Sequence, residues 1–249
     1  MSNNNTWLSN RKKEIPDGVW AKCLECGEII YNGELDRNLR ICRKCNYYFP
    51  FDPAGRISLI ADEATFHKYD DVKYSGNLDI DRFIISGEAL LSDQNMIIMV
   101  VNLNFTDMAT GFFVCEKIVN TISKSIDRKL PLLSFVTSYA ELPLQDGIFF
   151  PGQSISISAA LSKLEISRTP YISVISQSGS NSSFPGFVYV ADIVIAESNT
   201  LGESHTRSRI GRRESDRAAK IMFDNGIVDM VVSRRDMKER LADILSFFA

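Results

Sequence analysis

The chain has 249 residues, of which 45% are hydrophobic and 24% are charged, and its formal net charge is −3 at pH 7. This length leaves room for one large domain beside a small module. The negative net charge argues against a general nucleic-acid-binding protein, which normally carries an excess of Lys and Arg. No apolar run approaches the ~18 residues of a membrane span, and the polar N-terminus lacks the hydrophobic segment of a secretory leader, so we expect a soluble, cytoplasmic protein.

Two Cys-x-x-Cys pairs lie near the N-terminus, separated by fifteen residues. They consist of Cys23 and Cys26, and of Cys42 and Cys45. Each short turn directs two thiolates toward one point, and two such turns complete a tetrahedral Cys₄ shell around Zn²⁺. Disulfide pairing would require an oxidising compartment. The spacing therefore predicts a closed structural zinc site that takes no part in catalysis.

The zinc ribbon is predicted over residues 19–51, after a flexible tail at 1–18 and before a main domain at 52–249. The remaining cysteine, Cys115, lies in an apolar stretch, and we interpret it as a core residue rather than a nucleophile.

Beyond the ribbon, the hydrophobic periodicity alternates between helical and extended. The turn composition of residues 92–95 predicts that the first two long strands are antiparallel neighbours. The alternation that follows predicts a mainly parallel sheet covered by helices, an α/β fold. The expected helices are 56–66, 112–128, 155–166, 216–225 and 235–248, and the expected strands are 83–91, 96–105, 131–136, 171–175, 188–197 and 228–232.

Several short motifs are specific enough to indicate a family. They are 16–20 (Pro-Asp-Gly-Val-Trp), 22–27 (Lys-Cys-x-x-Cys-Gly), 34–39 (Glu-Leu-x-Arg-Asn-Leu), 42–45 (Cys-x-Lys-Cys), 170–174 (Pro-Tyr-Ile-Ser-Val) and 226–230 (Gly-Ile-Val-Asp-Met). Together they resemble the β subunit of bacterial acetyl-CoA carboxylase carboxyltransferase, over residues 15–248. The resemblance implies a crotonase-like ββα spiral with an N-terminal zinc ribbon. It also implies an oligomer with a separate α subunit, in which a carboxyl group passes from biotin on a carrier protein to acetyl-CoA.

The chain departs from this family at the loops where the resemblance predicts backbone oxyanion donors. Glycine allows a backbone N–H to approach the substrate closely, and other residues strain the loop or fill the pocket. The departing loops are 106–111 (Thr-Asp-Met-Ala-Thr-Gly), 138–142 (Ser-Tyr-Ala-Glu-Leu), 179–183 (Gly-Ser-Asn-Ser-Ser) and 203–208 (Glu-Ser-His-Thr-Arg-Ser). The pattern indicates that selection has kept the fold, while the family's reaction is either no longer maintained or has been changed to another one.

Polar residues in these loops are the candidates for new chemistry. The candidate catalytic residues are Ser138, Asn181, Ser182 and His205. A serine needs a neighbouring base to become a nucleophile, and a histidine can supply one. The alternative is that polar residues simply fill loops freed from constraint.

A second group of candidates would bind the coenzyme A or phosphopantetheine part of a thioester substrate. Gly111 is the last glycine of the first loop, and Arg207 and Arg209 follow His205. Guanidinium groups could bind the phosphates of coenzyme A or of a phosphopantetheinyl carrier, although such a cluster can also be a solvated face.

From these features we predict a divergent carboxyltransferase β-like protein that acts on an acyl-CoA or acyl-carrier thioester. Its altered chemistry would be decarboxylation, hydrolysis, acyl transfer or condensation, in a specialised acyl or polyketide pathway. The expected partners are an α-like subunit and an acyl or biotin carrier protein. One alternative is an inactive scaffold or regulatory partner of an α-like subunit. Others are ordinary acetyl-CoA carboxylation for fatty acid synthesis and, more weakly, a ribbon that contacts nucleic acid.

Overall fold

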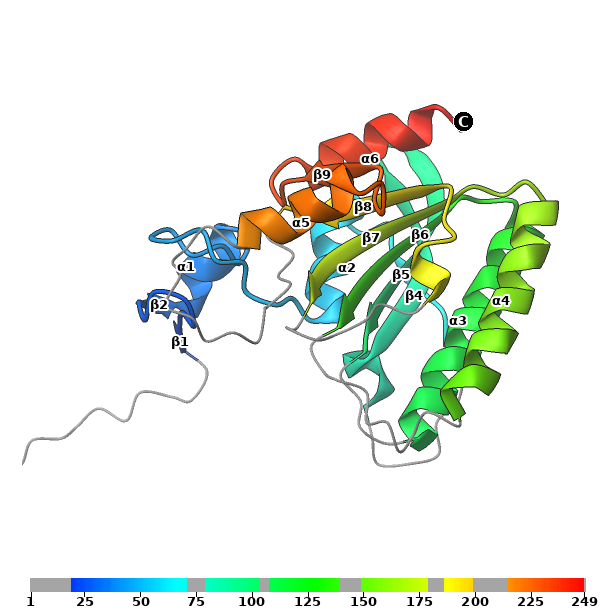
Figure 1. The fold of residues 1–249 in the computed structure, drawn as a ribbon, viewed down its shortest axis with the longest axis horizontal. Coiled ribbons are helices and arrows are strands. Elements are labelled where there is room, and N and C mark those ends of the chain that lie inside the picture. Colours follow the sequence, from blue (N-terminus) through cyan, green and yellow to red (C-terminus); the bar gives the residue numbers. More distant parts are fainter. Residues whose placement is uncertain are drawn as a thin grey trace, which may run out of the picture. The chain divides into compact units, whose positions relative to one another are not determined.

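The computed structural model describes residues 19–70, 79–103, 108–138, 149–178, 186–198 and 215–248 (Figure 1). The chain divides into two compact units, residues 1–49 and 50–249. Among the described helices, none is long and apolar enough to cross a membrane.

The N-terminal unit is a small ribbon. Strands β1 (Trp20–Lys22) and β2 (Ile29–Tyr31) pair antiparallel, and the helix α1 (Asn32–Arg37) follows directly. Its core consists of buried Cys23, Leu35, Cys42 and Phe49. Two of these four side chains are candidate metal ligands, so the metal site itself forms part of the core.

The larger unit is built on a sheet of seven strands within the described residues, in the spatial order β3-β4-β5-β6-β7-β8-β9 (Figure 1). Strands β3, β4 and β5 are antiparallel, and every later neighbour is parallel. The strands are β3 (His67–Lys68), β4 (Ile84–Leu91), β5 (Gln94–Asn102), β6 (Leu132–Ser138), β7 (Tyr171–Ser178), β8 (Ile193–Glu197) and β9 (Met230–Val232). This agrees with the predicted mainly parallel sheet.

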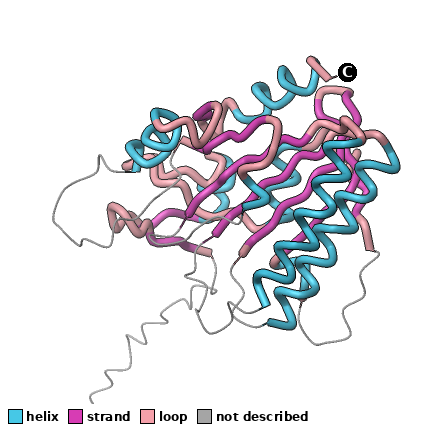
Figure 2. Tube along the Cα trace, turned by 45° about the vertical axis from the view of Figure 1, so that its right-hand side comes forward, coloured by secondary structure: helices cyan, strands magenta, loops and turns pink. Residues whose placement is uncertain are grey.

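Helices cover both faces of this sheet. The helices are α2 (Pro53–Ile60), α3 (Met108–Arg128), α4 (Phe149–Ile166), α5 (Ser215–Asp224) and α6 (Met237–Ser246), with 3₁₀ turns η1 (Ile80–Arg82) and η3 (Gly186–Val188). Apolar residues of α3, α4 and α5 join one core, and those of α2 and α6 join the other. Figure 2 shows α3 and α4 running side by side over one face.

The sequence explains why the two cores form. Along β5 the side chains of Ile97, Met99 and Val101 enter the core beneath α3 and α4, whereas Ile98 and Val100 enter the opposite core. Successive residues of a strand point to opposite faces, so a continuous apolar run is buried on both sides.

The hairpin between β4 and β5 is tighter than predicted. Ser92 and Asp93 form the connection, with φ of 50° and 63°. Two central residues with positive φ are characteristic of a type I′ turn, whose twist matches that of the flanking strands. The antiparallel pairing itself is confirmed.

The helix predicted at 56–66 is wrong at both ends. Helix α2 begins at Pro53, where the Asp52 carboxylate accepts the N–H of Gly55 at 2.6 Å. It ends at Ile60 because Ala61 is extended, with ψ of 153°. A capping carboxylate followed by proline is a helix-start signal that the apolar spacing alone does not reveal.

Other boundaries also differ from the predictions. The strand expected at 188–197 begins only at Ile193, because the preceding segment forms η3 and a turn. Helix α3 begins at Met108 rather than 112, and α4 at Phe149 rather than 155. Gly111 therefore lies inside α3, as its fourth residue, and not in a loop before the helix.

Candidate functional site

The four ribbon cysteines form a compact sulfur cluster. All four Sγ atoms lie within 4.8 Å of one another. Cys23 Sγ lies 3.5 Å from Cys45 Sγ, and Cys26 Sγ lies 3.7 Å from Cys42 Sγ. Sulfurs bound tetrahedrally at 2.3 Å from Zn²⁺ would be about 3.8 Å apart. The cluster therefore has the size of a zinc shell, as predicted.

Two equivalent turns hold these sulfurs. In the first turn, the Gly27 N–H donates to the Cys23 carbonyl at 2.9 Å, and in the second the Asn46 N–H donates to the Cys42 carbonyl at 2.8 Å. Gly27 and Asn46 both have positive φ, 71° and 59°. Glycine and asparagine are the residues that adopt this conformation most readily. Each pair is thus closed by a residue suited to the turn.

The electrostatics of the cluster also suit a metal. Burial raises the pKa of the Cys23 and Cys45 thiols. The backbone N–H of Glu28 lowers the pKa of Cys26 to about 7. Closely spaced thiolates repel one another, and a divalent cation compensates this charge. The donor set fits Zn²⁺, and all four ligands come from the protein, so the site is structural.

A row of polar side chains crosses the carboxyl end of the parallel strands in the larger unit. It consists of Asn102, Thr137, Ser176 and Glu197, all of which are buried. Each lies two residues beyond a residue of the core under α2 and α6, so all four face that side of the sheet. Thr137 Oγ1 and Ser176 Oγ are 3.0 Å apart, and Asn102 Nδ2 donates to the Arg82 carbonyl at 3.3 Å.

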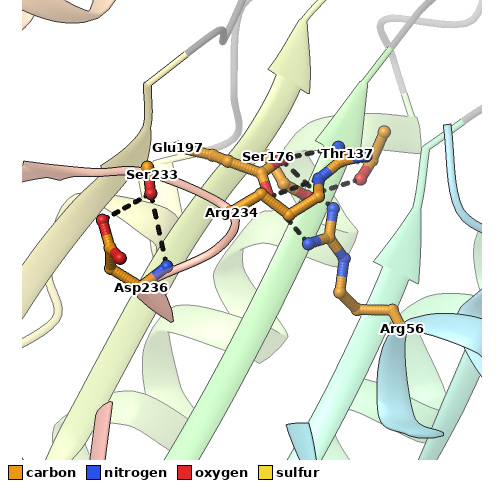
Figure 3. A network of polar contacts seen from close by, with 7 residues as sticks. All are labelled: Arg56, Thr137, Ser176, Glu197, Ser233, Arg234 and Asp236. Carbon is orange, nitrogen blue, oxygen red and sulfur yellow. Dashed lines mark hydrogen bonds and ion pairs between the residues drawn. The ribbon is translucent and has the colours of Figure 1, made fainter. Parts of the chain in front are cut away.

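Glu197 binds two arginines at this end of the sheet (Figure 3). Arg56 of α2 donates to the two carboxylate oxygens at 2.8 and 3.2 Å. Arg234, which follows β9, donates to them through Nε and Nη2, each at 2.9 Å. The guanidinium groups also lie over an aromatic ring. The guanidinium carbons of Arg56 and Arg234 are both about 5 Å from the centre of the Phe51 ring. We call Arg56, Glu197 and Arg234 the ion triad.

The protonation of Glu197 follows from this environment. Complete burial acts to raise its pKa, but the charges of Arg56 and Arg234 lower it to about 2. The carboxylate is ionised at neutral pH and is saturated by its two partners. It therefore joins α2, β8 and the segment after β9 and is not available as a base. Sequence reasoning missed the triad, for which the only signal was a glutamate ending an apolar strand.

A cavity and a groove lie between α3 and α4. The cavity has a volume of about 70 Å³ and is lined by residues of α3, α4, η3 and the end of β5, including Gly111, Cys115 and Phe187. The groove, of about 430 Å³, is lined by residues of α3 and α4, including Phe112, Val119 and Gly152. Burial raises the pKa of Cys115 to about 11, consistent with its prediction as a core residue.

Most of the predicted catalytic and substrate-binding residues cannot be placed in this geometry. Ser138 ends β6, but its side chain lies outside the described part of the structure. Outside it also lie Asn181, Ser182, His205, Arg207 and Arg209. Their roles remain predictions. Of the three residues predicted to bind the coenzyme A or phosphopantetheine part of the substrate, only Gly111 is placed, and it is buried.

Comparisons with known proteins agree with these features. Residues 20–45 match the acetyl-CoA carboxylase zinc finger domain. Over 97% of its length, the chain is 30% identical to the acetyl-coenzyme A carboxylase carboxyl transferase subunit beta of Desulforamulus reducens, of which it covers 91%. It is 29% identical to the corresponding subunit of Clostridium kluyveri, with coverage of 94% and 88%. It also matches the fused subunits beta/alpha of Clostridium tetani, at 30% identity over 94% of this chain and 44% of that one.

Solved structures with a similar fold cover most of the length of the chain. A Pseudomonas malonate decarboxylase hetero-tetramer in complex with malonate gives a TM-score of 0.55 at 15% identity, covering 86% of each chain. The beta subunit of Pseudomonas aeruginosa geranyl-CoA carboxylase gives 0.53 at 13% identity, covering 80% of this chain and 41% of that one. At these identities the likeness concerns the fold, and it confirms the predicted α/β, crotonase-like class with an N-terminal four-cysteine ribbon.

Proposed function

Because the chain belongs to the family of acetyl-CoA carboxylase carboxyl transferase beta subunits, we propose that it acts on an acyl thioester with chemistry that departs from acetyl-CoA carboxylation. The observation that supports this most is a contrast within one chain. The zinc ligands and buried strands are retained, whereas the loops that should present oxyanion donors keep only a few of the glycines that the resemblance predicts. A single oxyanion donor is typically worth ~10²–10³ in rate.

The candidate reactions share one requirement. Decarboxylation, hydrolysis, acyl transfer and condensation of a thioester all develop negative charge on the thioester oxygen or α-carbon. Side-chain donors such as Ser138 and Asn181 could stabilise that charge where backbone donors are missing. His205 would act as the base, since its unperturbed pKa is close to neutrality. Arg207 and Arg209 would bind the phosphates of coenzyme A or of a phosphopantetheinyl carrier.

The proposed partner is an α-like carboxyltransferase subunit. The support is that the Clostridium tetani relative carries beta and alpha subunits on one chain, of which this chain covers 44%. An acyl or biotin carrier protein would deliver the substrate. The zinc has a structural role in this scheme and supplies no chemistry to the reaction.

Reconstitution tests the proposal directly. The purified chain is combined with an α subunit of the family and a biotinylated carrier protein, and is offered acetyl-CoA or malonyl-CoA. We expect carboxylation of acetyl-CoA to be at least ~10²-fold below that of an authentic β subunit. Mass spectrometry of the thioesters would show conversion of malonyl-CoA to acetyl-CoA, free malonate or a transferred acyl group.

The other outcomes identify the alternatives. A family-typical carboxylation rate would show that side-chain donors replace the glycines and that the ordinary reaction is kept. Tight binding of the α subunit with no turnover of any thioester would identify a scaffold. Substituting His205→Ala should abolish an altered activity, while Arg209→Ala should mainly raise KM for the thioester. An activity untouched by His205→Ala would remove this histidine from the mechanism.

A further inference from the structure

The parallel pairing of β6 with β7 is interrupted near the carboxyl ends of these strands. Val136 pairs with Ile175. The next pair is Ser138 with Ser178, so one residue of β6 lies opposite two residues of β7. Such an arrangement is a β-bulge, and bulges occur often beside active sites, where they redirect a side chain or end the pairing. The regular backbone ladder is therefore broken just before the two strands end.

A pair of hydroxyl groups bridges this bulge. Thr137 is the single residue of β6 at the bulge, and Ser176 is the first of the two residues of β7. Their side-chain oxygens lie 3.0 Å apart, and the two residues are 6% and 0% exposed. Figure 3 shows both in the same polar network as Glu197 and Arg234. The hydroxyls thus join β6 to β7 at the place where the backbone ladder is irregular.

Packing alone does not require polar residues at this position. The preceding residues that face the same side, Phe135 on β6 and Val174 on β7, are buried and apolar. Replacing both partners of a buried hydrogen bond by apolar groups of the same shape is often nearly neutral for stability. A hydrogen bond, in contrast, restricts the distance and the orientation of its partners. The hydroxyl pair therefore contributes a defined geometry at the strand ends more than it contributes stability.

The bulge lies at the end of the sheet where the proposed reaction would take place. In open α/β sheets, ligands bind outside the carboxyl ends of the strands. Ser138 directly follows Thr137, and Asn181 follows Ser176 by five positions. These are the two residues proposed above as side-chain donors to the developing negative charge. A displacement of about 1 Å at a reacting group can lower the rate about 10²-fold, so the positions of both strand ends would affect turnover.

We propose that Thr137 and Ser176 are positioning residues, whose hydrogen bond across the bulge fixes the backbone of Ser138 for the reaction of the thioester. Both hydroxyls are buried, so they act through the strand ends and not by contact with the substrate. The reaction in this inference rests on the proposed function. The fixed position of the strand end, in contrast, is a property of the fold and can be measured without substrate.

A second buried Thr–Ser pair provides a matched control. Thr121 of α3 donates to Ser86 of β4 at 2.8 Å, and these residues are 2% and 0% exposed. This pair joins a helix to the antiparallel part of the sheet. The bulge variant is Thr137→Val combined with Ser176→Ala, and the control variant is Thr121→Val combined with Ser86→Ala. Each variant removes both partners of one buried hydrogen bond.

Hydrogen exchange measures the strand end in the absence of substrate. The Leu103 N–H donates to the Thr137 carbonyl at 2.8 Å and reports on the bulge. The Ile97 N–H donates to the Pro131 carbonyl at 2.9 Å, at the other end of β5 and β6, and serves as the reference. In the bulge variant we expect the Leu103 amide to lose protection while the Ile97 amide keeps it. The control variant should change neither amide, and urea denaturation checks that both variants fold.

Turnover measures the effect on the reaction. In the reconstituted assay with an α subunit, the bulge variant should lower kcat about 10²-fold with little change in KM, because the reacting groups are displaced while the substrate still binds. The control variant should turn over like the wild type. Thr137→Ser keeps a hydroxyl and should retain most of the wild-type rate. If the bulge variant does not fold, Thr137→Val and Thr137→Ser alone give the same comparison.

The two measurements separate the strand end from the proposed function. Unchanged exchange at Leu103 in the bulge variant would overturn the proposal, whether or not the chain turns over a thioester. Loss of protection with an unchanged kcat, or equal losses in the bulge and control variants, would overturn the positioning role. If the wild type turns over no thioester but only the bulge variant loses protection at Leu103, the fixed strand end is supported and the proposed function is overturned.

Discussion

Glu197 shows how one residue can secure several elements. Its carboxylate is 1% exposed and neutralises one of the two positive charges that surround it. Removing one partner of a buried ion pair leaves the others desolvated and uncompensated, which is far more costly than losing an exposed pair. The ion triad is therefore a sensitive point of the larger unit.

Substitution of Glu197 tests this at the residue scale. Glu197→Gln should lower the free energy of unfolding by about 3–5 kcal/mol, because two buried guanidinium groups lose their carboxylate. Urea denaturation followed by circular dichroism measures the change. The control is Asp243→Asn, which breaks the exposed pair with Arg240 at 3.5 Å and should cost no more than ~1 kcal/mol. Similar losses in the two variants would contradict the assignment of the triad.

The same carboxylate predicts a pH dependence. Its folded pKa of about 2 lies below its ordinary value of 4.5, so its contribution is present above pH 4.5 and is lost as the pH falls toward 2. The wild type should lose stability more steeply than Glu197→Gln across this interval. Denaturation midpoints measured between pH 5 and pH 2 give the two slopes, and parallel slopes would show that Glu197 titrates normally.

At the scale of elements, the pairing of β3 with β4 depends on a close approach of two backbones. A Cβ atom on Gly87 would lie 2.3 Å from the His67 carbonyl oxygen and 2.6 Å from Phe66 Cε2. No side chain fits there without separating the strands. This glycine explains why the short strand β3 can pair at the edge of the sheet.

Gly87→Ala should destabilise the larger unit by about 1–3 kcal/mol, since overpacking forces the backbone to move. Gly152→Ala is the matched control, because its Cβ meets nothing within 4 Å and alanine favours the helix. Thermal denaturation of both variants measures the difference. A Gly87→Ala protein as stable as the wild type would mean that β3 and β4 can separate without cost.

The ribbon is an element whose stability depends on its metal. We expect one zinc per chain by mass spectrometry, and a loss of hydrogen-exchange protection in residues 19–49 when a chelator removes it, because the four cysteines, two buried and two half-buried, form much of its core. Cys45→Ser should abolish stoichiometric zinc, whereas Cys115→Ser should retain it. Zinc-free protein with an equally protected ribbon would contradict this role.

At the scale of the whole molecule, the larger unit exposes several large apolar side chains. They include Ile221 and Phe223 of α5 and Val231 of β9, which are 50%, 49% and 37% exposed. Exposed apolar residues of this kind often mark protein interfaces. We expect light scattering to give a mass above that of one chain, alone or with an α-like subunit. A strict monomer under both conditions would contradict the predicted assembly.

The features that could be predicted from the sequence are those that depend on local spacing. Cys23, Cys26, Cys42 and Cys45 indicated zinc because a Cys-x-x-Cys turn positions its own two sulfurs. The alternation of apolar patterns predicted the parallel sheet because strand and helix periods differ.

Only the tertiary structure could reveal features formed by distant residues. Arg56 and Glu197 are 141 positions apart, and no periodicity connects them, so the ion triad appears only when folding brings the Arg56 side chain of α2 to the end of β8. The cavity and the groove that Cys115 and Gln153 line likewise exist because α3 and α4 meet over the sheet. Packing determines which distant side chains become neighbours and where space remains between them, and neither property is encoded in any single segment.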